Sequence, residues 1–239
     1  MNQGIYPLAA TMINQFNRVD LLSNNLANAN TNAFKQDYVS EGSFNNYLKR
    51  AEEKKEEVSK LNRITNIIPK IDTFYTDKTL GSITPTNNEL DFAIKETNMF
   101  FKVRNSDTGE TYLTRDGSFN IIDGKLVTKN GYHVLNTDDE PINAQNNFEQ
   151  QIALVKTEFT NLDKQGNNNY KVINEDSLEE QLTNTDFVLQ GALERSNVNS
   201  ITTMVALIDS HRRLEQAQKA MTGIDDINQK VIDKIGNGR

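Results

Sequence analysis

Few side chains in this sequence could perform catalytic or metal chemistry. The 239 residues include two histidines, His133 and His211, and no cysteine. A chain without thiols forms no disulfide, thiolate zinc site or cysteine nucleophile, and two histidines are too few for a three-histidine zinc site. The acidic run 138–140 lacks the spaced ligands and the glycine of a calcium loop, and His133 has no serine or carboxylate at triad spacing. The sequence therefore predicts no enzyme activity, no metal site and no cofactor.

The charge distribution also excludes several classes of partner. The chain has 26 Lys and Arg against 33 Asp and Glu, a net charge of −7. A nucleic-acid-binding protein presents a basic face to phosphates, and no segment here is more than slightly positive. No run approaches the roughly 18 apolar residues of a membrane-spanning helix, and the first residues lack the basic flank and apolar core of a cleaved signal. We expect no nucleic-acid partner and no direct membrane insertion.

Apolar side chains recur at helical spacing near both ends of the chain. Near the N-terminus they follow steps of three and four residues at Ile5, Leu8, Met12, Phe16, Val19, Leu22 and Leu26. Near the C-terminus the same spacing runs from Ile201 through Val205, Ile208, Leu214 and Met221 to Ile235. This periodicity predicts two long helices that pack as a coiled-coil-like layer. Because such a pair leaves apolar surface uncovered, we expect further faces to pack against neighbouring copies.

The pattern between the two predicted helices is typical of short strands. Residues 90–94 alternate and 100–103 are rich in β-forming side chains, while Asp116-Gly117, Asp123-Gly124 and Asn130-Gly131 are hairpin turn signals. The expected fold class is α+β, with long N- and C-terminal helices and an inserted antiparallel β-rich central domain. The expected divisions are an axial helix over 1–36, an arm over 37–79 with a charged helix at 47–63, the β-rich domain over 80–177, and a return segment with the second axial helix over 178–239.

Three blocks of sequence resemble one known family. Residues 23–35, SNNLANANTNAFK, resemble the N-terminal signature of the bacterial flagellar rod and hook proteins. Residues 191–198, followed by Met204, Ile208 and Arg212-Arg213, resemble the C-terminal helix of that family. The segments 90–94, 100–101, 114–119 and 124–132 resemble its central β-domain. The blocks occur in the same order and span nearly the whole chain, so the protein is identified as a member of this family.

The departures from the family pattern bear on which member this is. Ala33 stands where the family usually has glycine before Phe-Lys, residues 96–99 replace the usual glycines before Phe-Phe, and Leu214 replaces a common aromatic residue. The segment after the first motif is the charged run 47–63, whereas distal rod proteins carry a Gly/Pro/Gln-rich insertion there. The chain is most similar to the proximal rod protein adjacent to the distal rod. The distal rod protein is the alternative.

The resemblance implies a structural subunit that polymerises into the helical rod of the flagellar basal body and transmits torque from motor to hook. Implied partners are copies of itself, other rod proteins and the flagellar type III export apparatus, and the implied location is the rod within the periplasm. A monomeric adaptor that binds through its β-domain and a peptidoglycan hydrolase are the competing classes, although the hydrolase lacks a carboxylate pair or metal site.

The expected assembly interface combines the apolar stripes with the terminal motifs. The amides of the Asn-rich motif can either bind neighbouring subunits or cap the first helix, and both roles are expected. The expected interface residues are Ile5, Leu8, Met12, Phe16, Val19, Leu22, Asn24, Asn25, Leu26, Asn28, Asn30, Phe34, Ser196, Asn197, Val198, Ile201, Val205, Ile208, Leu214 and Met221.

Overall fold

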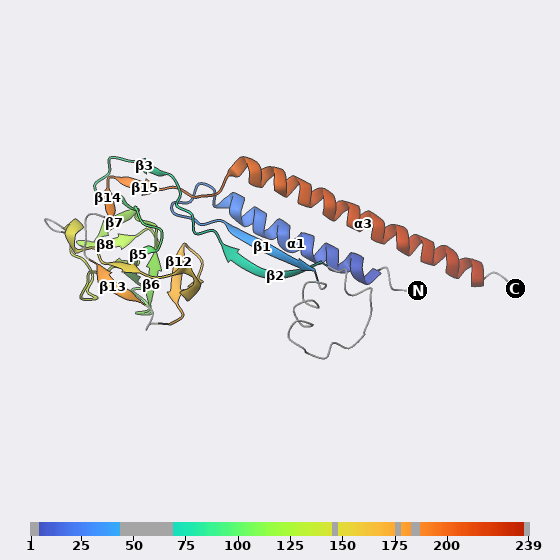
Figure 1. Ribbon diagram of the computed structural model, residues 1–239, viewed down its shortest axis with the longest axis horizontal. Helices are drawn as coiled ribbons and strands as arrows, with labels where there is room; N and C mark the ends of the chain where they lie inside the picture. Colours follow the sequence, from blue (N-terminus) through green and yellow to red (C-terminus); the bar gives the residue numbers. More distant parts are fainter. Residues whose placement is uncertain (1–4, 44–68, 145–147, 175–177, 183–186, 237–239) are drawn as a thin grey trace, which may run out of the picture. The chain divides into compact units, whose positions relative to one another are not determined.

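The computed structural model describes residues 5–43, 69–144, 148–174, 178–182 and 187–236 (Figure 1). The chain forms two compact units. The helical unit comprises Met1–Ala27, Asp37–Thr76 and Asn199–Arg239, and the β-rich unit comprises Asn28–Gln36 and Asp77–Val198. The chain therefore passes between the units four times. The charged helix expected at 47–63 lies outside the described residues, and the domain boundaries drawn from the sequence stay predictions.

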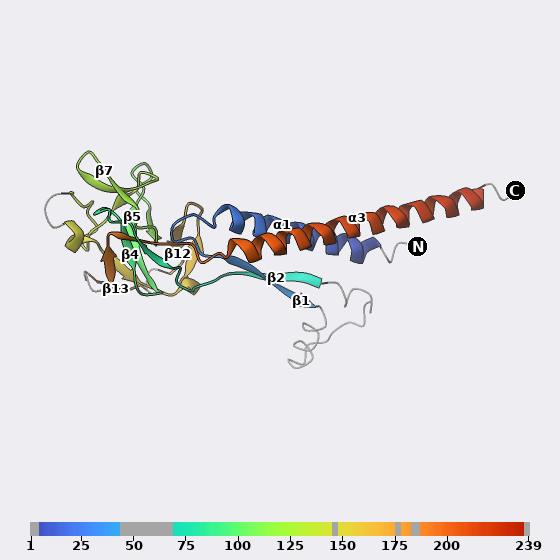
Figure 2. The same ribbon diagram turned by 90° about the horizontal axis from the view of Figure 1, so that it is seen from above.

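The helical unit contains two α-helices and a β-ribbon. Helix α1 spans Ile5–Ala27 and helix α3 spans Ser200–Gly236, and the two lie side by side in both views (Figures 1 and 2). The start of α3 is capped by Asn199, whose Oδ1 accepts hydrogen bonds from the backbone N–H groups of Ile201 and Thr202, both at 3.1 Å. Strands β1 (Asp37–Ser43) and β2 (Pro69–Thr76) pair antiparallel and contact α1.

The fully buried residues of the two helices are mostly polar. On α3 the buried residues recur at spacings of seven, four and three, and they are Thr203, Ser210, Leu214 and Ala217. On α1 the buried residues are Asn14, Gln15, Leu22 and Asn25. The large apolar residues of the start of α3, Ile201, Met204, Val205 and Ile208, are instead exposed, as are Ile13 and Phe16 on α1.

These observations correct the expected fold class. Among the described residues there are fifteen strands and only two α-helices, and the N-terminal helix is a short one of 23 residues. The chain is mostly β-rich, so the prediction of long N- and C-terminal helices forming a coiled-coil-like layer is wrong. Periodicity failed here because α3 has apolar residues on more than one face, and spacing alone does not show which face packs.

The β-rich unit is built around one branched antiparallel sheet. Its strands are β5 (Met99–Arg104), β6 (Thr111–Thr114), β7 (Phe119–Ile122), β8 (Lys125–Thr128), β9 (His133–Val134), β10 (Leu154–Lys156), β11 (Leu162–Lys164), β12 (Asn169–Val172) and β13 (Glu179–Leu182). The strand order is β11-β12-β6-β5-β9-β8-β7, and β10 pairs with both β5 and β13. Two ribbons of two strands each, β3 (Ile83–Pro85) with β15 (Ala192–Glu194) and β4 (Phe92–Ile94) with β14 (Val188–Gln190), bring the two ends of this unit's sequence together. Short 3₁₀ helices occupy Phe148–Gln151 and Phe159–Asn161.

Strand β5 is buried on both sides. Successive side chains of a strand point to opposite faces, and the neighbours Phe100 and Phe101 accordingly belong to two different hydrophobic clusters. Phe101 packs edge-to-face on Phe119, and Phe100 packs edge-to-face on Tyr170. The Phe-Phe pair of the sequence motif therefore places one aromatic side chain of β5 in each of the two hydrophobic clusters.

The predicted turns have different outcomes. Asp123 and Gly124 have φ of +52° and +75° and join β7 to β8, which confirms the tight hairpin expected there. The hairpin expected at Asp116-Gly117 is wrong, because β6 and β7 on either side of it pair with other strands. Gly117 is required for a different reason: a Cβ atom there would lie 1.9 Å from the carbonyl oxygen of Phe92.

Candidate assembly surface and buried ion cluster

The expected interface residues divide between the two units and among very different environments. Ile5 is the first residue of α1. The buried members are Leu22, Asn25, Phe34 and Leu214. The half-buried members are Leu8, Met12, Val19, Leu26, Asn28, Ser196, Asn197, Val198 and Met221. The exposed members are Phe16, Asn24, Asn30, Ile201, Val205 and Ile208. Contact with a neighbouring subunit stays a prediction for all twenty.

The exposed members on α3, together with Met204, form an uncovered apolar surface, here called the α3 stripe, which comprises Ile201, Met204, Val205 and Ile208. The exposed fraction is 76% for Ile201 and 48% for Ile208. Their spacing of three and four residues places them on one side of the helix. Clustered exposed apolar side chains of this kind mark protein–protein contact sites in soluble proteins.

The asparagine motif acts within the chain at two positions. Asn25 is fully buried, donates from Nδ2 to the carbonyl oxygen of Asp37 at 2.7 Å, and accepts from the Asp37 N–H through Oδ1 at 3.0 Å. This side chain thus replaces a strand partner at the start of β1. Asn28 accepts from the hydroxyl of Thr31 at 3.1 Å, and its carbonyl oxygen accepts from the Thr31 N–H in the turn that follows α1.

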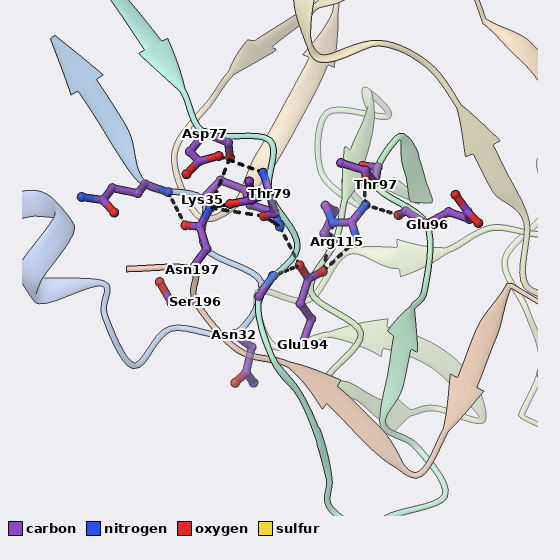
Figure 3. A network of polar contacts seen from close by, with 12 residues as sticks. Asn32, Lys35, Asp77, Thr79, Glu96, Thr97, Arg115, Glu194, Ser196 and Asn197 are labelled. Carbon is purple, nitrogen blue, oxygen red and sulfur yellow. Dashed lines mark hydrogen bonds and ion pairs between the residues drawn. The ribbon is translucent and has the colours of Figure 1, made fainter. Parts of the chain in front are cut away.

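The terminal motifs meet inside the β-rich unit (Figure 3). The Asn197 side chain accepts from the backbone N–H of Gln36 at 2.7 Å and donates to the carbonyl oxygen of Thr79 at 3.2 Å. The Ala33 N–H donates to the carbonyl oxygen of Glu194 at 2.8 Å. Three segments far apart in sequence, residues 32–36, 77–81 and 194–197, are therefore joined directly. We call them the connecting segments, because each lies within a few residues of a point where the chain passes between the units.

A buried ion cluster lies at the centre of the connecting segments. It consists of Lys35, Arg115 and Glu194, whose side chains have no exposed surface. The Lys35 Nζ lies 2.6 Å from Glu194 Oε1, and the Arg115 Nε donates to Glu194 Oε2 at 3.0 Å. One carboxylate thus faces two cations, and the cluster has a formal charge of +1.

Neutral oxygen atoms also accept hydrogen bonds from the two cations. Lys35 Nζ also donates to the carbonyl oxygen of Thr79 at 2.6 Å, and Arg115 Nη1 donates to the carbonyl oxygens of Glu96, Thr97 and Met99 at 2.7–2.9 Å. These last three residues lead into β5, so Arg115 links the cluster to the central strand. The usual family glycines are absent from residues 96–99, and this stretch here supplies carbonyl acceptors.

Burial dominates the electrostatics of Lys35. Desolvation lowers the pKa of its amine below the ordinary value, Glu194 opposes this effect, and Arg115 adds to it. The remaining Glu194 interaction is with backbone, because Gly81 donates its N–H to Oε1 at 3.0 Å. Glu194 is therefore the shared partner of both cations and of a connecting segment.

This cluster was missed by the reasoning from sequence. Lys35, Arg115 and Glu194 each belong to a separate motif block, and they are 80 and 79 positions apart along the chain. No local signal marked them, since Arg115 lies between Thr114 and Asp116 and Glu194 lies beside Arg195. Only the tertiary structure shows that these charges meet.

The turn at Ala33 is kept despite the missing glycine. Ala33 has φ of +55°, a left-handed conformation that favours glycine, and is buried with 1% exposure. Its hydrogen bond to Glu194 holds this conformation.

Neither a metal-binding cluster nor a membrane-spanning helix occurs in the described part of the chain. The described residues contain no group of three or more His, Asp or Glu side chains that could hold a metal ion. No described helix combines the length and apolar character that crossing a membrane requires.

Comparisons with known proteins agree with this arrangement. Residues 95–166 match the family described as flagellar hook protein FlgE/F/G D1 domain, and residues 189–234 match the flagellar basal body rod FlgEFG protein C-terminal family. Flagellar basal-body rod protein FlgF of Rhizobium meliloti (strain 1021) is 30% identical over 100% of both chains. Flagellar hook-basal body complex protein FlhO of Bacillus subtilis (strain 168) is 27% identical over 99% of both. Flagellar basal-body rod protein FlgG of Buchnera aphidicola subsp. Baizongia pistaciae (strain Bp) is 29% identical over 89% of this chain and 92% of its own. With sequence motifs, a central β-domain and full-length relatives in agreement, this chain belongs to the family of flagellar basal-body rod proteins.

Proposed function

We propose that this protein is a structural subunit of the flagellar basal-body rod that polymerises with copies of itself and with other rod proteins. The observation that carries the proposal is the α3 stripe, an apolar surface left uncovered in a chain related over its full length to rod proteins. Covering such side chains in a neighbour contributes about 25 cal/mol for each Å² removed from water. Because the α3 stripe stays exposed in the single chain, association between subunits supplies the burial that these side chains lack.

Within the family we propose the proximal rod as its place. The FlgF relative matches all of this chain, whereas the FlgG relative named above matches 89% of it. A rod in this position would lie in the periplasm and transmit torque towards the hook. Its subunits would reach that place through the flagellar type III export apparatus. A tag on this chain, located in images of purified basal bodies, tests the position, and a tag along the distal part of the rod would contradict it.

The assembly role is tested by Ile208→Asp in the bacterium that encodes the chain, expressed in place of the natural protein. Ile208 is half exposed, so the substitution leaves the core of the single chain intact. At a subunit contact it would bury an unpaired carboxylate, which costs several kcal/mol. We expect monomer with normal helical content but no completed rods and no swimming.

The matched control is Gln218→Asp, which introduces the same side chain at an exposed polar position of α3 outside the stripe. It should leave rods and swimming normal. Normal rods in the Ile208→Asp strain would exclude the α3 stripe as an assembly contact.

A further inference from the structure

The ion cluster contains two cations and only one anion, so the single anion, Glu194, interacts with both cations. Most buried charges in proteins are paired, because an unpaired buried charge is strongly unfavourable. Here two buried cations, Lys35 and Arg115, share the single carboxylate of Glu194. Loss of Lys35 would leave a one-to-one pair, whereas loss of the Glu194 charge would leave two adjacent cations with no anion inside the cluster. Asp77, the other carboxylate that acts on Lys35, has the smallest effect on its pKa.

Each member of the cluster belongs to a different part of the β-rich unit. Lys35 lies in the segment 28–36, which reaches the unit from the N-terminal side, and Glu194 ends strand β15. Arg115 follows β6 and binds the backbone that leads into β5. The segment 77–81 contributes the Thr79 carbonyl oxygen to Lys35 and the Gly81 N–H to Glu194.

We propose that Glu194 is a charge lock that orders all three connecting segments as one cooperative element anchored to the central sheet. With Glu194 ionised and in place, residues 32–36, 77–81 and 194–197 are held together and fastened through Arg115 to β5. Without its charge the three segments open together, while the sheet behind them stays folded. The three points beside these segments where the chain enters or leaves the β-rich unit, at 36–37, 76–77 and 198–199, are thereby held together or released together. This lock does not depend on the proposed assembly.

The close backbone packing beside the cluster explains why the element moves as a whole. A Cβ atom at Gly81 would lie 1.8 Å from the carbonyl oxygen of Arg195, so the segments 77–81 and 194–197 are in direct backbone contact. The Arg195 N–H also donates to the carbonyl oxygen of Ser82 at 2.9 Å. One segment therefore cannot shift without displacing the other.

The lock is tested by amide hydrogen exchange on the full-length Glu194→Gln variant. The reporting amides are Ala33, Gln36, Gly81 and Arg195, each of which donates a hydrogen bond inside the connecting segments. We expect their exchange to accelerate together by about a hundredfold, on the scale of leaving a buried charge unpaired. Amides of β5 and β8 should keep their protection.

The matched control is Glu110→Gln, which removes a carboxylate from the surface ion pair with Lys171 in the same unit. Exposed pairs contribute little, so the reporting amides should exchange as in the natural protein. Acceleration confined to one segment, or equal loss of protection in β5 and β8, would overturn the cooperative lock.

A second variant keeps the proposal testable if Glu194→Gln fails to fold. Lys35→Met leaves Arg115 and Glu194 as a neutral pair, so it should perturb exchange less than Glu194→Gln. The double variant Lys35→Met/Glu194→Gln leaves one buried cation rather than two, so it should fold even where Glu194→Gln does not, and it should be the more protected of the two where both fold. A double variant that fails to fold while Lys35→Met folds normally would contradict the role of charge. A double variant that exchanges faster than Glu194→Gln would show that Glu194 acts by packing and not by charge.

Discussion

The face of α3 that packs in the single chain can be tested with two matched truncations. Leu214 and Ile201 were both expected in one apolar stripe, yet Leu214 has 8% exposure and Ile201 has 76%. Leu214→Ala removes a buried side chain from the contact with α1. Ile201→Ala removes a side chain of the same size that lies mostly in water.

The expected magnitudes differ strongly. Truncating a buried leucine to alanine costs about 2–5 kcal/mol, and a site in a two-helix contact that keeps some exposure belongs at the lower end, about 2–3 kcal/mol. For Ile201→Ala the lost burial is small and alanine favours the helix by a few tenths of a kcal/mol, so the net change should lie within about 0.5 kcal/mol. With about 2–4 °C for each kcal/mol in a chain of this size, Leu214→Ala should lower Tm by about 5–10 °C.

The assay is thermal unfolding of the verified monomer, followed by the helical circular dichroism signal, because both helices belong to the helical unit. Assembly of each variant into rods provides the complementary measurement, in which Ile201→Ala should be the more harmful change. A fall in Tm for Ile201→Ala as large as that for Leu214→Ala would refute the assignment of the packing face.

Two further predictions concern single positions. Gly117→Ala should destabilise the β-rich unit by about 2 kcal/mol or more, because the new Cβ would lie 1.9 Å from the Phe92 carbonyl oxygen. Gly223→Ala, with no atom within 4 Å of the new Cβ, should stabilise α3 by about 1 kcal/mol. Chemical denaturation measures the free energy of unfolding of both variants, and changes of the same sign would contradict the packing described for Gly117. Burial first and Lys125 second lower the pKa of His133 below 6.5, so the unfolded chain binds a proton at higher pH than the folded one, and the free energy of unfolding should decrease as pH falls through that value. His133→Gln should remove this part of the pH dependence in denaturation curves recorded on either side of that pH, and an unchanged profile would show that His133 does not contribute.

Local sequence determined the elements whose partners are near in the chain. The alternation and turn residues around Asp123-Gly124 predicted a hairpin that the structure confirms, because both strands and the required φ values are encoded within ten residues. The same reasoning failed at Asp116-Gly117, where the glycine serves a close approach to Phe92 from another strand. The motif blocks also identified the family, since their order and residue types need no tertiary information.

The tertiary structure alone decided which helix face is buried and which charges meet. Helix α3 carries Ile201, Val205 and Ile208 on one side and Leu214 on another, so periodicity offered two faces and only contact with α1 selected between them. Lys35, Arg115 and Glu194 are separated by long stretches of chain, and no local pattern links a lysine to a glutamate 159 positions away. Their pairing depends on how the ends of the β-rich unit close on each other, because a buried charge is tolerated only where folding brings its partner to it.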